Sequence, residues 1–198
     1  MLPAGYWNQS LIDIQNEFAN QVLGYDNPYT GMRIADDPAL ALVDMNNEKN
    51  IYTANMTSST GSYYNELNEK FSAWLKNKYT SREALRLAWL PKTYDETSWC
   101  NVGLQNSEDP WSVGKPVQIM DDKEDGSLDR GRFTKGRGKD AKTFLCELEA
   151  AYYSQRMNFL KNTVGVKCPV SGGTAYTSNQ IENFYAMTNT DFISTHLY

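Results

Sequence analysis

The chain has 198 residues, of which 40% are hydrophobic and 13% aromatic, and its formal net charge is −5 at pH 7. This composition is typical of a globular protein, and the mild acidity argues against a nucleic-acid-binding protein because no sustained basic face offsets it. No apolar run approaches the roughly 20 residues that cross a bilayer, and residues 1–10 lack the charged and apolar regions of a signal peptide. We therefore expect no membrane span and no nucleic-acid partner. The compartment stays open, and a secreted or periplasmic full-length protein is compatible with this chain.

The first predicted element is a helix over residues 10–24. Ser10 is a suitable N-cap, because its hydroxyl can accept a hydrogen bond from a backbone N–H of the first turn. Apolar residues recur at helical spacing and predict a buried face, formed by Leu11, Ile14, Phe18 and Val22. The stretches NPYTG (27–31) and DDP (36–38) then predict a loop.

A short apolar run follows at residues 40–43, LALV, and it leads to a carboxylate preceded by two amides, Asn46, Asn47 and Glu48. A run of this length after Pro38 is typical of a strand. A strand with two apolar faces belongs to a parallel sheet covered by helices, and reactive groups gather at the carboxyl ends of such strands. The sequence therefore predicts Glu48 as a site residue.

Two helices are predicted before a long irregular segment. The first spans residues 62–78, with a buried face of Tyr64, Leu67, Phe71, Trp74 and Leu75. The capping box TSRE at residues 80–83 opens the second helix, which Pro91 ends. Residues 91–138 show no clear period, so we expect a loop-rich insertion that covers a binding face.

A long helix is predicted over residues 139–163, and Gly165 stops it. Its buried stripe comprises Ala141, Phe144, Leu145, Leu148, Tyr152, Phe159 and Leu160. A strand at 166–170, a helix at 178–189 with Ile181, Phe184 and Tyr185 on one face, and a last strand at 191–198 complete the order. This alternation predicts β–α–β units with parallel strands. Three such strands do not close a barrel, so we expect part of a larger domain.

Together these segments resemble the large clan of retaining glycoside hydrolases built on the TIM (β/α)8 barrel, especially the cellulase and mannanase type. One strand of that clan ends in Asn-Glu, here Asn47 and Glu48, and a strand two positions later ends in His-x-Tyr, here His196 and Tyr198. NPYTG, DDPALALVDMNNE and the helix KTFLCELEAAYYSQRMNFL also look like a bacterial branch of these enzymes. The resemblance implies an α/β fold in which residues 1–198 form a partial catalytic barrel, from the third helix through the sixth strand, with residues 91–138 inserted.

The resemblance also implies the chemistry, which is hydrolysis of a β-linked glycoside or polysaccharide with retention and without a cofactor or metal. Retention takes two carboxyl groups about 5 to 5.5 Å apart. Glu48 would be the general acid/base, Asn47 would bind the sugar 2-hydroxyl, His196 would line the subsite of the cleaved sugar, and Tyr198 would orient the nucleophile. The nucleophilic Glu is expected on the next strand, beyond the end of this chain, together with the remaining barrel strands.

Three alternatives compete with this interpretation. The first is a barrel that binds carbohydrate without catalysis, the second an inactive fragment, and the third an unrelated α/β interaction domain in which Glu48 is surface charge. Several aromatic residues near predicted loops are candidates for sugar stacking, although each favours packing: Trp7, Tyr52, Trp99, Trp111 and Tyr176.

Other motifs favour structural roles. An EF-hand alignment of residues 121–132 fails, because Lys123 takes a ligand position and Arg132 stands where a bidentate Glu is required. The glycines of residues 131–138 lack the Lys-Ser/Thr ending of a phosphate loop. The three cysteines, Cys100, Cys146 and Cys168, form no metal pattern, and we expect them to be core thiols.

Overall fold

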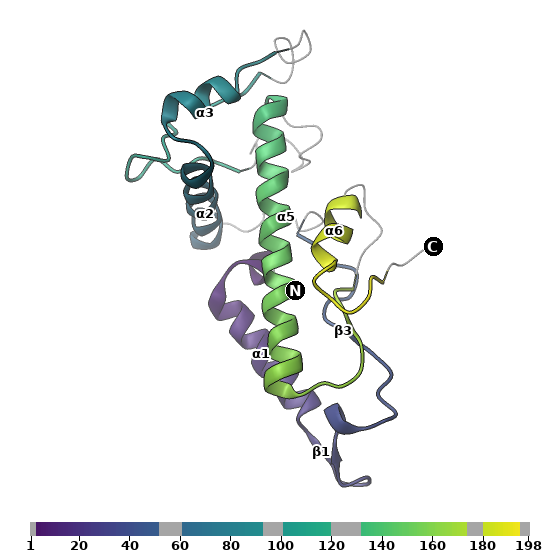
Figure 1. Ribbon diagram of the computed structural model, residues 1–198. Coiled ribbons are helices and arrows are strands. Elements are labelled where there is room, and N and C mark those ends of the chain that lie inside the picture. Colours follow the sequence, from purple (N-terminus) through teal and green to yellow (C-terminus); the bar gives the residue numbers. More distant parts are fainter. Residues whose placement is uncertain (1–2, 52–60, 93–100, 120–131, 174–179, 195–198) are drawn as a thin grey trace. The chain divides into compact units, whose positions relative to one another are not determined.

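The computed structural model describes residues 3–51, 61–92, 101–119, 132–173 and 180–194. The chain forms two compact units. Unit 1 combines residues 1–54 with residues 146–198, and unit 2 is residues 55–145. The long helix α5 (Lys135–Asn158) begins in unit 2 and ends in unit 1. Figure 1 labels the main elements.

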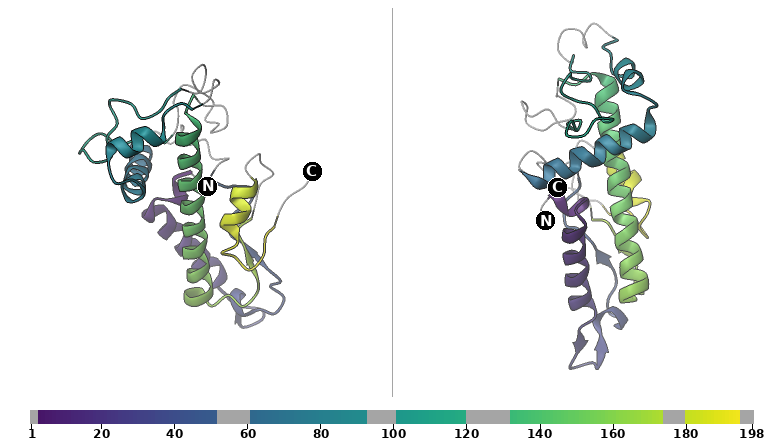
Figure 2. Two further views of the ribbon diagram at one scale, coloured as in Figure 1. Left: turned by 45° about the horizontal axis from the view of Figure 1, so that its top comes forward. Right: turned by 90° about the vertical axis from the view of Figure 1, so that its left-hand side faces the viewer.

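In unit 1, a short 3-10 helix η1 (Pro3–Tyr6) leads into α1 (Gln9–Leu23). The N-cap of α1 is Asn8, whose side-chain oxygen accepts a hydrogen bond from the Leu11 backbone N–H at 3.2 Å. The prediction of Ser10 as the cap was therefore wrong by two residues. Helix α1 runs beside the part of α5 that follows Cys146 (Figure 2), where Tyr152 Oη donates to Gln15 Oε1 at 2.7 Å.

The buried face of α1 differs from the predicted one. Ile14 and Phe18 of the predicted stripe are 60% and 67% exposed, whereas Ile12 and Leu23 are buried. Helix α6 (Gln180–Met187) shows the same reversal, because Ile181 is 82% exposed. Its buried residues are Asn183, Ala186 and Met187. Apolar spacing identifies a stripe, but the neighbouring elements decide which stripe is covered.

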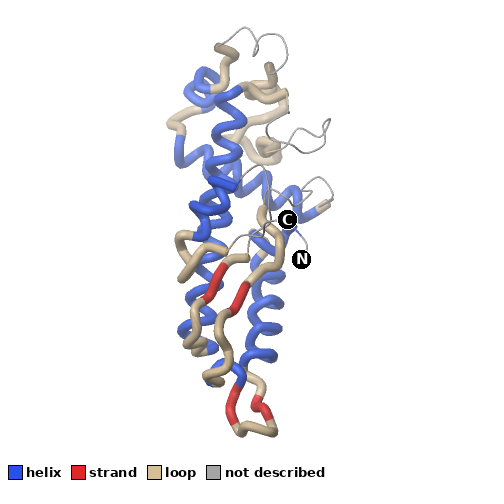
Figure 3. The backbone as a smooth tube through the Cα atoms, turned by 90° about the vertical axis from the view of Figure 1, so that its right-hand side faces the viewer, coloured by secondary structure: helices blue, strands red, loops and turns tan. Residues whose placement is uncertain are grey.

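Two short sheets lie in unit 1, drawn in red in Figure 3. Strands β1 (Asp26–Asn27) and β2 (Met32–Arg33) form an antiparallel hairpin that encloses the NPYTG turn, and the 3-10 helix η2 (Ile34–Asp36) follows it. Strands β3 (Val43–Asp44) and β4 (Val170–Ser171) pair in parallel, and an isolated parallel bridge joins Ser171 to Phe192. The predicted parallel relation of these segments is confirmed, although each strand is much shorter than predicted.

The structure overturns the predicted partial TIM barrel. The structure is mostly helical (53%), and the strands of its described residues form two sheets of two strands each, without a barrel arrangement. In the run at residues 40–43 only Val43 enters the ladder, and Leu42 is 49% exposed. An exposed Leu42 is not the doubly buried strand of a barrel wall, since such strands are covered on both faces. The apolar pattern therefore predicted that the segments around Val43 and Val170 pair in parallel, but it did not predict the architecture around them.

The core of unit 1 lies where the end of α5 turns back toward the sheet. A π-helical segment, η4 (Phe159–Val164), follows α5 and ends at Gly165, which adopts the left-handed conformation (φ 84°) predicted for a helix stop. The buried cluster here comprises Leu23, Ala35, Leu160, Val164, Val166 and Val170. Val43 and Cys168 pack against it, which confirms the predicted core position of Cys168.

Unit 2 packs α2 (Ser62–Lys78) and α3 (Arg82–Ala88) with the first turns of α5. The bounds of α2 match the prediction, and its buried apolar residues are Leu67, Phe71 and Leu75. Ser81, not Thr80, caps α3, because its hydroxyl accepts from the Ala84 N–H at 3.1 Å. Helix α5 begins four residues before the predicted Lys139. No helix of the described residues is long and apolar enough to cross a membrane.

Candidate functional site

The candidate site is the 46–51 turn, six residues that begin two positions after the end of β3 in unit 1. The ladder extends past β3, because Met45 N–H donates to the Ser171 carbonyl at 2.9 Å and Asn46 N–H to the Gly172 carbonyl at 3.1 Å. Glu48 then adopts φ 52°, which makes it the one non-glycine residue with a positive φ in the described part of the chain. A non-glycine residue in this conformation is strained and persists only where the surroundings impose it.

Gly173, two residues after β4, lies against the backbone of Asn46 in the turn. A Cβ at Gly173 would lie 1.6 Å from the Asn46 carbonyl oxygen, and Gly173 also has a positive φ of 71°. The neighbouring Gly172 faces the Tyr153 ring, where a Cβ would meet the ring carbons at 2.9 Å. Only glycine allows both contacts, so residues 172–173 form a backbone support for the turn.

Gly173→Ala is expected to lower the free energy of unfolding by about 3 kcal/mol, because a left-handed alanine costs about 1–2 kcal/mol and the clash with Asn46 adds a comparable amount. Gly31→Ala is the matched control. Gly31 also has a positive φ (69°), but a Cβ there meets nothing within 4 Å. Urea denaturation of both variants measures the difference, and equal losses would contradict the close approach as its cause.

Two side chains of α5 contact the two ends of the turn. The Tyr152 hydroxyl oxygen lies 3.2 Å from Asn46 Oδ1, and Glu149 Oε1 accepts the Ile51 backbone N–H at 2.9 Å. Tyr152 and Glu149 are three residues apart and therefore lie on the same face of the helix. The strained Glu48 lies between these two attachments, so α5 determines the path of the backbone that carries it.

Glu149 belongs to a buried polar cluster, which we define as Tyr6, Asn46, Glu149, Tyr153 and Asn183. Each member has a buried side-chain atom that makes no hydrogen bond of ordinary geometry to another described residue. Burial raises the pKa of Glu149 to about 7, while the Ile51 N–H and the nearby Asn183 amide act in the opposite direction. Burial, followed by the Glu149 charge, also raises the pKa of Tyr153. Both effects favour the neutral form of each group.

Two of the four predicted site residues lie in the described part of the chain. Asn47 and Glu48 lie together in the turn, where Asn47 is exposed and Glu48 partly exposed, whereas the neighbouring Asn46 is buried. His196 and Tyr198 lie outside the described residues, and their predicted roles stay predictions.

Sequence reasoning missed Glu149. The residue follows Leu148 of the predicted stripe and comes four residues after Leu145, so it occupies a buried position of the helix. A carboxylate at such a position is unusual, because ionised side chains are almost never fully buried without a partner. That conflict between charge and apolar pattern was the available signal.

Two of the five aromatic residues named as candidates for sugar stacking lie in the described part of the chain. Trp7 is 3% exposed, which confirms a packing role, and Trp111 is partly exposed in unit 2. Tyr52, Trp99 and Tyr176 lie outside the described residues, as do Cys100 and most of the rejected calcium stretch. The described residues contain no group of three or more His, Cys, Asp or Glu side chains that could hold a metal ion.

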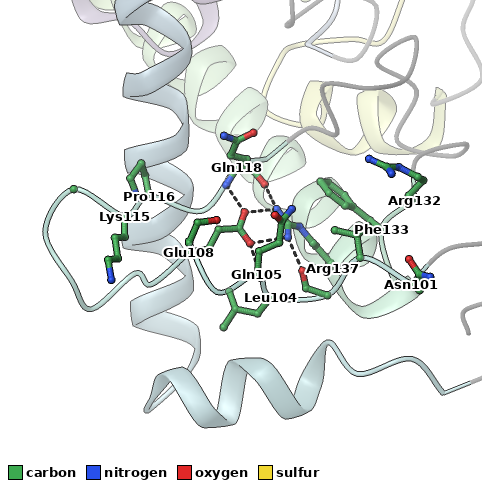
Figure 4. Close-up of a pocket in the computed structure, with 14 residues that line it drawn as sticks. Asn101, Leu104, Gln105, Glu108, Lys115, Pro116, Gln118, Arg132, Phe133 and Arg137 are labelled. Atoms are coloured by element: carbon green, nitrogen blue, oxygen red, sulfur yellow. Dashed lines mark hydrogen bonds and ion pairs between the residues drawn. The ribbon is translucent and has the colours of Figure 1, made fainter.

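Unit 2 contains a polar pocket of about 730 Å³, shown in Figure 4. Arg137 and Glu108 lie at its centre as a buried ion pair with two contacts of 2.6 and 2.8 Å. Arg137 also donates to the carbonyls of Gly103 and Gln118, each at 2.6 Å. Both Glu108 oxygens accept further backbone N–H groups, from Gln105 and Gln118. This carboxylate is fully occupied in holding loops together, so its arrangement indicates a structural role.

Comparison with protein-family models, with curated proteins and with solved structures found no match for this chain. Its candidate function therefore depends on the residues of the 46–51 turn and on the elements that hold them.

Proposed function

We propose that the 46–51 turn carries the general acid/base of a retaining β-glycoside hydrolase, with Glu48 in that role. The observation that supports the proposal best is the backbone of Glu48, which lies two residues after the last hydrogen bond of a parallel ladder and adopts φ 52°. Strain of this kind clusters at functional sites, where it orients a reactive group in advance. The resemblance in the segment around Asn47 and Glu48 supplies the reaction class.

In this mechanism Glu48 donates a proton to the leaving glycosidic oxygen and later removes a proton from the attacking water. Asn47, the exposed amide beside it, donates a hydrogen bond to the 2-hydroxyl of the cleaved sugar. That contact strengthens in the transition state and so contributes to catalysis rather than to ground-state binding alone. A second carboxyl group about 5 to 5.5 Å from Glu48 would act as the nucleophile.

Glu48→Gln tests this proposal in the complete protein. We expect release of reducing sugar from unactivated β-linked glucans or mannans to fall by at least about 10³-fold, because the amide cannot transfer the proton. The matched control is Lys49→Gln, the adjacent exposed side chain, which is expected to leave the rate within about twofold. An unchanged rate in Glu48→Gln would remove this residue from the mechanism.

The same variants distinguish hydrolysis from carbohydrate binding without catalysis. It predicts that the wild-type protein releases no reducing sugar and that oligosaccharide affinity, measured by calorimetry, survives Glu48→Gln. The absence of both hydrolysis and binding across β-linked glucans, mannans and galactosides would leave Glu48 as a surface charge and would overturn the proposal.

A further inference from the structure

The strained conformation of Glu48 requires anchors on both sides of the turn. On the N-terminal side Asn46 is bound to the Gly172 carbonyl and to the Tyr152 hydroxyl. On the C-terminal side the anchor is the Glu149 side chain, which accepts the Ile51 N–H three residues after Glu48. Glu149 and Ile51 are both fully buried. Without this acceptor the Ile51 N–H would be a buried donor that has lost its hydrogen bond to Glu149, which is unfavourable.

We propose that Glu149 is a positioning residue for Glu48, acting through the hydrogen bond that its Oε1 accepts from the Ile51 N–H. This inference rests on the proposed function in so far as Glu48 acts on a substrate, but the anchoring itself is independent of catalysis. Glu149 touches neither substrate nor reacting atoms in this arrangement. It acts only through the turn.

The Ile51 N–H uses one of the two Glu149 oxygens. Oε1 accepts this hydrogen bond, whereas buried Oε2 makes no hydrogen bond of ordinary geometry to a described residue. Burial raises the pKa of Glu149 to about 7 and so favours its neutral form at lower pH. Both the neutral and the ionised carboxyl group can accept the Ile51 N–H through Oε1.

The surroundings of Glu149 supply little countercharge. The groups that interact with it electrostatically are the phenols of Tyr6, Tyr152 and Tyr153, and burial raises the pKa of each. These phenols are therefore neutral at physiological pH. The charged residues on the segments that contact Glu149 include Glu48 and Lys49 in the turn, Glu182 beside Asn183, and Lys142, Glu147 and Arg156 on α5. Of these only Arg156 is buried, and it interacts with the Tyr152 hydroxyl. The titration of Glu149 is accordingly governed by burial.

Two variants of Glu149 separate anchoring from packing. Glu149→Gln keeps a carbonyl acceptor for Ile51 and, like the neutral acid, carries no charge. Glu149→Met keeps much of the volume but removes the acceptor. Hydrogen exchange of the Ile51 amide, followed by NMR on the full chain, is the readout, because a role in packing alone would leave it unchanged in the methionine variant.

We expect exchange of the Ile51 amide to be at least about tenfold faster in Glu149→Met and near wild type in Glu149→Gln, since a lost hydrogen bond of about 1.4 kcal/mol corresponds to tenfold. In the wild-type protein the Ile51 amide resonance should also titrate near pH 7, and that titration should vanish in Glu149→Gln. Equal protection of Ile51 in both variants, or a wild-type resonance that does not move between pH 5 and 9, would overturn the anchoring.

The catalytic consequence has a separate readout. If Glu48 is the acid/base, Glu149→Met should lower kcat by about 10–100-fold with little change in KM, because small misplacement of a reacting group reduces rate rather than binding. Glu149→Gln should retain most of the activity. A full wild-type kcat in a methionine variant whose Ile51 amide has lost protection would overturn the link to Glu48. If the wild-type protein shows no hydrolase activity, the exchange result for Ile51 still holds. Failure of the proposed function and failure of the anchoring are therefore distinguishable.

Discussion

Arg137→Met is expected to lower the free energy of unfolding by about 3–5 kcal/mol, because it leaves Glu108 as an uncompensated buried charge. Arg137 is 0% exposed and pairs with Glu108, which is 3% exposed. The guanidinium also lies 4.0 Å from the centroid of the Phe133 ring. Removing it breaks the ion pair, two carbonyl contacts and this cation–π interaction in one step. Four of the five tryptophans lie between residues 55 and 145, so urea denaturation followed by tryptophan fluorescence reports on unit 2.

The chain offers a matched control for this change. Arg86 also pairs with a glutamate, Glu83, at 2.7 Å, but both side chains are largely exposed (41% and 60%). Arg86→Met should therefore change the free energy of unfolding by less than about 1 kcal/mol. The double variant Arg137→Met with Glu108→Met should recover much of the loss, since apolar side chains replace both members of a buried pair well. Equal small losses in the two single arginine variants would contradict the structural role of the Arg137 pair.

Replacing Glu149 by Gln is expected to remove a pH dependence of stability that the wild-type protein shows between about pH 4.5 and 7. Burial raises the pKa of Glu149 from 4.5 to about 7 in the folded state. The folded protein therefore binds this proton more tightly than the unfolded chain does. Stability from this group is fully present below pH 4.5, falls as the pH rises to about 7, and stays low above that. The expected loss is on the order of 3 kcal/mol, at about 1.4 kcal/mol per pH unit.

Chemical denaturation at several pH values, compared between wild type and Glu149→Gln, isolates this group. Contributions shared by both proteins cancel in the difference, including that of the single histidine. The lowered pKa values of Asp36, Asp109 and Asp191 act in the opposite direction and at lower pH, because ion pairs or hydrogen bonds favour their charged forms. Glu147→Gln, an exposed position on the same helix, should leave the slope unchanged. Parallel pH profiles for wild type and Glu149→Gln would show that Glu149 is ionised normally in the fold.

The candidate site could be predicted only in part. The sequence indicated that Asn47 and Glu48 follow a strand, and the ladder of β3 with β4 agrees. The anchors were not predictable, because Glu149 and Tyr152 lie about a hundred positions away along the chain and reach the turn only through the packing of α5. The supporting role of Gly173 likewise depends on its contact with Asn46, a residue more than a hundred positions away.

The sequence by itself determined the local elements. Helix α2 has the predicted bounds, Gly165 ends its helix in the left-handed conformation, and the segments around Val43 and Val170 pair in parallel. These features depend on interactions within a few residues, or on an apolar run that favours a strand wherever it is placed. Tertiary structure alone decided which stripe of α1 is buried, how short the strands are, and that no barrel forms. Each of these depends on which neighbours cover a surface, and burial by distant segments also gave Glu149 its raised pKa.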